Sequence, residues 1–300
     1  MATGPPSPPI PPEILKQVNR IALRTRGLVD TLLAGEYRSV FRGHGMEFAE
    51  VRAYADGDDY RTIDWNVSAR LGAPYVKLFT EEREVTFFLV VDRSGSTGVG
   101  SPVSKAEREV EVAAVLALAA ARENDRVGTL AFTDRVEHIV SPAKGRIHAL
   151  RVIRDLLAFH PAGHGTDLVA ALHRTARLLR HRSVVVILSD FLAPEWDKPL
   201  RQLSARHEVF AITVDDPRDA KPPPSGWLQF RDAESGQEVL ANTGDDDLRR
   251  RWAAAGSRRQ ATRHDRIQAA GAYHVALGTT GDYATPLRRA FARRIHRRGR

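Results

Sequence analysis

The stretch VTFFLVVDRSGST, residues 85–97, decides the fold of this 300-residue chain. Residues 85–91 form a nearly continuous run of β-branched and aromatic residues, which is typical of a strand buried on both faces. A loop rich in side-chain oxygens follows directly. The same order recurs at residues 184–190, where the run VVVIL is followed by Ser189 and Asp190. These two runs predict neighbouring strands of a sheet with polar loops at its carboxyl edge.

Apolar strands alternate with amphipathic helices from residue 85 onward. Further strands are expected at residues 127–132, 209–214 and 273–277. Helices are expected at residues 105–123, 147–159, 167–179, 196–205, 245–268 and 286–297. This alternation predicts a Rossmann-like α/β fold, with a mostly parallel sheet and helices on both faces. A hairpin insertion is expected near residues 226–241, because two short apolar runs there flank a turn-rich stretch.

The residues ahead of this sheet divide into two parts. Residues 1–12 contain six prolines and predict a disordered lead-in. Apolar side chains then recur at helical spacing to about residue 33, so an N-terminal helix is expected. Residues 34–84 mix glycines, charges and aromatics without a sustained period and predict an irregular segment of short strands and turns. We therefore expect an N-terminal segment at 13–84, an α/β domain at 85–296 and a basic tail at 297–300.

Composition narrows the classes of protein. The longest apolar stretch, residues 112–121, has ten residues, whereas about 18 are needed to span a bilayer. Residues 1–12 lack the basic start and apolar run of a secretory signal, so a cytoplasmic location is expected. Seven arginines in the last thirteen residues account for all but +1 of the net charge of +8. A solvated helix face is the favoured interpretation of this tail, and binding to RNA, anionic lipid or an acidic partner is the alternative.

Oxygen-bearing side chains follow the predicted strands and predict a site for a hard cation. Asp92, Ser94 and Ser96 are spaced i, i+2, i+4 in the loop after the first strand. Thr166 precedes a predicted helix and Asp190 follows a strand, so both belong at the same rim. Each of these residues alone is also a typical helix cap or turn residue. Oxygen donors, in a chain without cysteine, select Mg²⁺, Ca²⁺ or Mn²⁺. Water or a carboxylate from another protein is expected to complete the coordination.

These loops resemble the metal-ion-dependent adhesion site of von Willebrand factor A (VWA) domains. The sequence VVDRSGS at residues 90–96 resembles the first loop of that site in VWA domains. GTD at 165–167 resembles the second loop, and LSD at 188–190 resembles the third. The resemblance implies that Ser94, Ser96 and Thr166 coordinate Mg²⁺, with Asp92 and Asp190 acting directly or through water. Asp167 and His164 are further candidates for supporting these ligands.

The segment before the sheet resembles the signature of domain-of-unknown-function family 58, whose members place it ahead of a VWA-like domain. It reads RGHGMEF at 42–48, RAYADGDD at 52–59, RTIDW at 61–65 and SAR at 68–70. The resemblance covers about residues 13–296. The charged residues of the signature segment predict an ion-pair network with Trp65 and Phe48 in its core. We therefore interpret the segment as structural, with a partner-binding surface as the alternative. The residues concerned are Arg42, Glu47, Arg52, Asp58, Asp59, Arg61, Asp64, Trp65 and Arg70.

Two functions remain open for the same set of residues. Members of the family are often considered with MoxR-type AAA+ ATPases, which implies a role in assembling or maturing other proteins. The leading hypothesis is a non-enzymatic interaction module whose ion captures an Asp or Glu of a protein partner, either such an ATPase or its client. The alternative is a Mg²⁺-dependent hydrolase, a phosphoesterase, with Asp167 or His164 as the base. Neither a phosphate-binding G-x-x-x-x-G-K-[ST] motif nor a G-x-S-x-G motif surrounds Ser94 and Ser96.

Overall fold

The structure is a computed structural model, and it describes residues 12–25, 27, 29, 45–82, 85–95, 103–163, 165–231 and 236–298. The chain divides into two compact units. One comprises residues 41–85, and the other comprises residues 1–40 together with 86–300. No helix in the described ranges is both long and apolar enough to cross a membrane.

The larger unit is built on a six-stranded sheet with the order β10-β7-β6-β3-β4-β5. Its strands are β3 (Thr86–Asp92), β4 (Arg126–Phe132), β5 (Val136–Ala143), β6 (Val184–Leu188), β7 (Glu208–Asp215) and β10 (Tyr273–Gly278). All neighbouring strands run parallel except β4 and β5. Every residue of β6, and of β3 after Thr86, is buried, as their uninterrupted apolar runs predict. The prediction of a mostly parallel sheet is confirmed.

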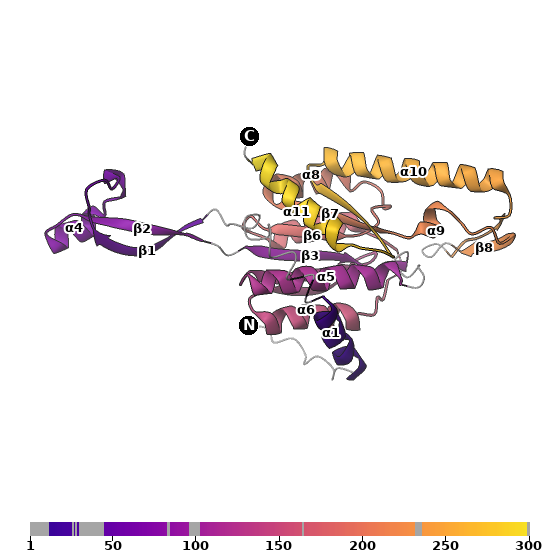
Figure 1. Cartoon of the computed structure of the whole chain (residues 1–300), viewed down its shortest axis with the longest axis horizontal. Helices are drawn as coiled ribbons and strands as arrows, with labels where there is room; N and C mark the ends of the chain where they lie inside the picture. The colour runs from indigo at the N-terminus through magenta and orange to yellow at the C-terminus, as the bar shows by residue number, and fades with distance from the viewer. Residues whose placement is uncertain are drawn as a thin grey trace. The chain divides into compact units, whose positions relative to one another are not determined.

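Helices cover both faces of the sheet, which confirms the predicted α/β fold class. On one face α5 packs against α6 and α1, and on the other α8 packs against α7 and α10 (Figure 1). α11 packs against β10, with the rings of Phe291 and Phe210 4.6 Å apart. The helices are α1 (Pro12–Arg24), α5 (Lys105–Arg122), α6 (Arg146–Ala158), α7 (Leu168–Leu178), α8 (Asp197–Arg206), α9 (Pro217–Ala220), α10 (Asp246–Ala269) and α11 (Ala284–Arg298).

Helix α5 is buried along most of its length because few of its positions are polar. Its apolar residues from Val110 to Ala120 are almost all fully buried, so the helix packs between the sheet and α6. A capping box begins it, in which Ser104 and Glu107 satisfy each other's backbone N–H groups. This helix starts shortly after the loop that follows β3 and therefore brings its first turns close to the carboxyl edge of the sheet.

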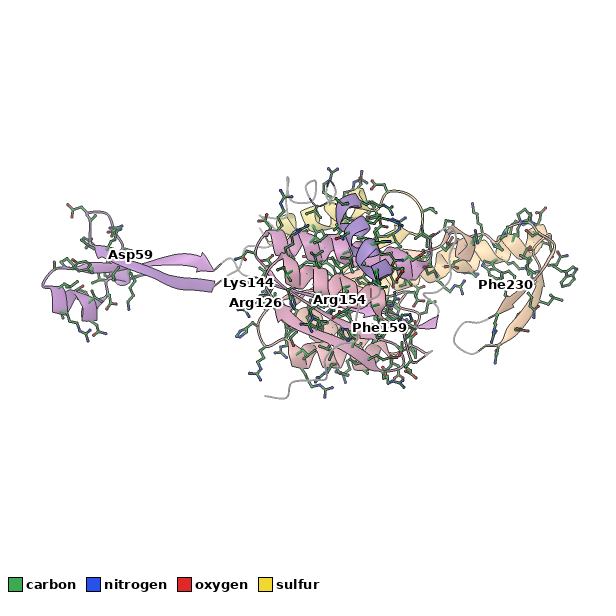
Figure 2. The ribbon with its side chains drawn as sticks, turned by 90° about the horizontal axis from the view of Figure 1, so that it is seen from below. Asp59, Arg126, Lys144, Arg154, Phe159 and Phe230 are labelled. Atoms are coloured by element: carbon green, nitrogen blue, oxygen red, sulfur yellow. The ribbon has the colours of Figure 1, made fainter. Side chains whose placement is uncertain are left out.

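Two elements of the larger unit are not predicted by the sequence pattern. β5 is a half-exposed edge strand, and its sequence VEHIVSPA has no clear alternation; Pro142 is tolerated there because edge strands can lack one donor. α9 is a single turn capped by Asp216. The predicted hairpin is present as β8 (Trp227–Arg231) and β9 (Glu238–Asn242). Phe230 of the hairpin, labelled in Figure 2, packs on Trp252 of α10, with ring centroids 5.1 Å apart.

The smaller unit contains the signature segment, residues 42–70. β1 (Gly45–Ala53) and β2 (Tyr75–Glu82) pair antiparallel, and the connection between them contains η1 (Tyr60–Thr62) and α4 (Trp65–Leu71). Asp64 caps α4 by accepting hydrogen bonds from two backbone N–H groups. The irregular strands and turns expected between residues 34 and 84 are therefore present in the described part of that range.

The predicted ion-pair network is only partly present. Arg52 pairs with Asp58 at 2.7 Å, whereas Asp64 pairs with Lys77 at 3.2 Å. In the described part of this unit Arg61 and Arg70 form no ion pair. Arg61 lies over the ring of Tyr60 instead, and Asp59 caps η1. Arg42 and the side chains of Glu47 and Phe48 lie outside the described residues.

The prediction that Trp65 lies in a core is wrong, because its side chain is 69% exposed. Trp65 is the first residue of α4, and the helix turns Ser68 inward instead. The Ser68 hydroxyl donates to the Asp64 carbonyl at 2.7 Å and accepts from the Tyr75 backbone N–H at 2.9 Å. This short helix is thus held to the hairpin by polar contacts rather than by its aromatic residue.

Candidate metal centre

The topology of the sheet brings three polar loops to one place. β3 has β4 on one side and β6 on the other, and such a switch point is where open α/β sheets bind ligands, at the carboxyl ends of the strands. Asp92 is in register with Phe132 of β4, and Val91 is in register with Leu188 of β6. The loops that follow these three strands therefore leave the sheet next to one another.

Asp92 ends β3 and is completely buried. Its Oδ1 accepts from the Ser94 backbone N–H at 2.9 Å, and its Oδ2 accepts from the Ser189 hydroxyl at 2.7 Å. Burial raises the pKa of Asp92 to about 6, against the opposing effect of its hydrogen bonds, and the negative charge of Asp190 contributes to the increase. The carboxylate is thus fixed in orientation at a position where a negative charge is costly.

Asp190 follows β6 and is 5% exposed. Its Oδ1 accepts from the Leu192 backbone N–H at 3.0 Å, which closes a tight turn. Its backbone carbonyl accepts from Nη1 of Arg263 at 2.9 Å. The charge of Asp190 acts on Asp92 and contributes to the raised pKa of Asp92, and Ser94, which is also buried, donates its backbone N–H to Asp92.

The loop that contains Thr166 is attached to the end of β4. The Asp167 backbone N–H donates to the Thr133 carbonyl at 2.7 Å, and the Arg93 backbone N–H donates to the Phe132 carbonyl at 2.8 Å. The loops after β3 and before α7 are thus bound to successive carbonyl groups. The Asp167 side chain caps α7 by accepting from the Ala170 N–H at 2.8 Å, and Thr166 is half-buried.

Glu137 of β5 organises the residues ahead of Thr166. Its carboxylate accepts from the backbone N–H groups of Ala162 at 2.9 Å and Gly163 at 2.8 Å, and also from the Thr133 hydroxyl. Burial raises the pKa of Glu137, but these hydrogen bonds outweigh burial and lower the pKa overall. A Cβ at Gly163 would lie 2.4 Å from Oγ1 of Thr133, so a side chain at position 163 would displace the Thr133 hydroxyl and disturb this loop.

Three residues that position the site are missed by sequence reasoning. Ser189 holds Asp92, Glu137 holds the loop before Thr166, and Arg263 holds the carbonyl of Asp190. Arg263 also binds both carboxylate oxygens of Asp215 on β7, at 2.8 and 2.6 Å. Ser189 directly precedes Asp190, a predicted ligand, so its place in the sequence could have indicated its role. Nothing in the sequence around Glu137 or Arg263 indicates that they position the site.

The described donors fit a hard divalent cation. No group of three or more His, Cys, Asp or Glu side chains in the described ranges is arranged to hold a metal, so the predicted set depends on hydroxyl oxygens as well as the two carboxylates. Asp92 and Asp190 supply two negative charges at a buried position, and oxygen-only donors suit Mg²⁺ or Ca²⁺. Ser96 and His164 lie outside the described residues.

Comparison with known proteins places the chain in a family. The model of the family described as protein of unknown function DUF58 matches residues 50–262. The uncharacterized protein Rv1480 of Mycobacterium tuberculosis is 35% identical over 293 residues, which cover 96% of this chain and 91% of that protein.

Two solved structures have a lower similarity. The conserved hypothetical protein BatB from Bacteroides thetaiotaomicron is 14% identical with a TM-score of 0.46, covering 71% of this chain and 99% of that one. A von Willebrand factor type A structure from Catenulispora acidiphila is 12% identical with a TM-score of 0.40, covering 87% of this chain and 51% of that one. By the match to the family model and the identity to the mycobacterial relative, this chain belongs to the DUF58 family.

Proposed function

We propose that this chain is a protein-interaction module whose binding depends on one divalent cation, Mg²⁺ or alternatively Ca²⁺ or Mn²⁺. The single observation that supports the proposal is the burial of two interacting carboxylates at the carboxyl edge of the sheet. Two like charges buried together cost free energy unless a cation neutralises them. The proposed ligands are Asp92, Ser94, Ser96, Thr166 and Asp190.

The residues around the site keep the proposed ligands in place. The Ser189 hydroxyl and the Ser94 N–H orient the carboxylate of Asp92, and Arg263 fixes the turn of Asp190. The hydrogen bond from the Asp167 N–H to the end of β4 holds the loop of Thr166. Such support reduces the reorganisation that ion binding would require.

The proposed partner is a protein that offers an aspartate or glutamate to the ion. The two carboxylates and the neutral hydroxyl oxygens of the chain do not fill all six coordination positions of an ion such as Mg²⁺, so a further carboxylate can complete the coordination. The bound ion would act as a Lewis acid toward that group. The family resemblance suggests a MoxR-type AAA+ ATPase, or a client of one, as this partner.

Affinity capture from lysate and binding to a purified MoxR-type ATPase of the same genome test the proposal. The wild-type chain is compared with Asp92→Ala, each in Mg²⁺ and in EDTA. Asp247→Ala is the matched control, because Asp247 is an exposed acidic residue of α10, paired with Arg250. We expect binding in Mg²⁺ that is lost in EDTA and in Asp92→Ala but kept in Asp247→Ala. Unchanged partner binding in EDTA, or full binding by a folded Asp92→Ala chain, would contradict the proposal.

A further inference from the structure

The two edge strands of the six-stranded sheet differ in how they are protected from further pairing. β5 forms one edge and β10 the other. β5 contains Pro142, and register shifts interrupt its pairing with β4; proline and irregular pairing are means by which proteins keep an edge from adding a strand. β10, with the sequence YHVALG, has neither proline nor a Lys, Arg, Asp or Glu residue, and it pairs with β7 in an unbroken register. The edge formed by β10 is therefore suited to accept another strand.

A groove of about 430 Å³ follows the free edge of β10. Its lining includes the five consecutive residues 272–276. Because side chains alternate between the two faces of a strand, a hollow that contacts consecutive residues lies along an edge and not over one face. Gln268 of α10 and Pro286 and Arg289 of α11 complete the walls; α10 and α11, labelled in Figure 1, both pack against β10. Since β7 occupies the other side of β10, the groove lies where a further strand would pair.

The backbone of β10 offers hydrogen bonds to such a strand. Alternate residues of an edge strand direct their N–H and C=O groups away from the one neighbouring strand. Among the residues that the structure describes, no strand other than β7 pairs with β10. An extended peptide that lies along this edge satisfies these groups and places its alternate side chains toward the walls of the groove, which is the binding mode called β-augmentation. The six residues of β10 set the length of the peptide stretch that pairs.

The charge of the groove selects the kind of peptide. Arg289 is exposed, it forms no ion pair within the described ranges, and no acidic side chain lines the groove. A guanidinium binds a carboxylate through charge-assisted hydrogen bonds. A second copy of the chain, paired through the same strand, would bring to Arg289 only YHVALG, which contains no acidic residue. We propose that the free edge of β10 binds an extended acidic segment of a protein partner, which adds to the sheet as a strand and places an Asp or Glu on Arg289. This surface contains none of the proposed cation ligands, so the inference goes beyond the proposed function.

The test selects displayed random peptides, slightly longer than β10, on the full chain in EDTA. The enriched peptides should alternate β-branched or aromatic residues with others and carry an Asp or Glu. Fluorescence anisotropy then measures the binding of labelled, enriched peptides to the wild type, R289E and R288E. R289E should bind at least about tenfold more weakly, because attraction becomes repulsion. R288E is the matched control and should bind like the wild type, since Arg288 is the exposed neighbour of Arg289 on α11 but does not line the groove.

Two changes in the peptide test the two parts of the proposal. Replacing its acidic residue with Lys should weaken binding to the wild type and restore binding to R289E. Peptides N-methylated at odd or at even positions test backbone pairing, because a strand uses the N–H groups of only alternate residues toward one neighbour. One version should bind within about threefold of the unmodified peptide, and the other should bind at least about tenfold more weakly. Equal affinities of the two versions would overturn strand addition.

The outcomes also separate this surface from the cation site. Peptide binding should be the same in EDTA and in Mg²⁺ and should persist in Asp92→Ala. Binding that requires Mg²⁺ and disappears in Asp92→Ala would assign the peptide carboxylate to the cation site and overturn this inference while supporting the proposed function. A selection that enriches no peptide, or binding that R289E leaves unchanged, would also overturn it. A wild-type chain that sediments as a dimer and exposes β10 to hydrogen exchange only on dissociation would assign the edge to a second copy instead.

Discussion

Replacing Asp92 with asparagine should make the ion-free protein more stable and abolish ion binding. Asp92 has a folded-state pKa of about 6, against an ordinary value of 3.8. The folded protein therefore holds this proton more tightly than the unfolded chain does. Ionisation of Asp92 consequently lowers the free energy of unfolding at every pH above about 6, and the cost fades as the pH falls toward 3.8. Asparagine has no such cost.

The size of the effect follows from the difference between the two pKa values. At about 1.4 kcal/mol per pKa unit, a rise from 3.8 to about 6 gives a ceiling of ~3 kcal/mol. The asparagine oxygen can still accept from the Ser94 N–H, and its NH₂ group can donate to the Ser189 hydroxyl if that hydroxyl turns. Imperfect hydrogen bonds reduce the gain by ~1 kcal/mol. We therefore expect a net stabilisation of roughly 1–3 kcal/mol at pH 8.

Urea unfolding followed by circular dichroism measures this difference. Wild type and Asp92→Asn are compared in EDTA at pH 8 and pH 5, with Asp247→Asn, at an exposed position, as the control. The advantage of Asp92→Asn should shrink at pH 5, and added Mg²⁺ should stabilise only the wild type and the control. A variant less stable than the wild type at pH 8, or a difference that does not change with pH, would refute the reasoning.

Three further predictions concern residues that position the site and the loss of stability at low pH. Arg263→Ala should lower the free energy of unfolding by about 2 kcal/mol, because it leaves the half-buried Asp215 and the carbonyl of Asp190 without this partner; it should also weaken Mg²⁺ binding, measured by calorimetry. Gly163→Ala should weaken Mg²⁺ binding by displacing the Thr166 loop, whereas Gly165→Ala, whose Cβ would meet its nearest neighbour at 3.6 Å, should not. Burial lowers the pKa of His207 to about 4, so stability should be full above pH 6.5 and fall as the pH drops toward 4. Urea unfolding of His207→Leu should show a shallower loss over that range, and an identical slope would count against this assignment.

The central strands are predictable from sequence because their complete burial requires a continuous run of apolar residues. β3 and β6 are buried on both faces, and such strands are apolar at nearly every position. β5 has no such run, because an edge strand with only one neighbouring strand tolerates polar residues and proline, here His138 and Pro142. Trp65 shows the converse error: an aromatic residue suggests a core, but a short helix held by Asp64 and Ser68 leaves it exposed.

Some residues of the candidate site are likewise predictable from sequence, and others are not. Asp92 and Asp190 are predictable, because each follows a recognisable strand and parallel strands end at one edge. Arg263 and Glu137 are not, because they reach the site from distant elements. Arg263 is 73 residues from Asp190, whose carbonyl it binds, and only the packing of α10 brings them together.

The most direct test of the central claim is a crystal structure of the chain grown in Mn²⁺, with anomalous scattering to locate the ion. The account predicts a single strong peak bounded by Asp92, Ser94, Ser96, Thr166 and Asp190, with an open coordination position facing solvent. Crystals without a peak there, or with the Thr166 hydroxyl turned away from the Asp92 loop, would contradict it.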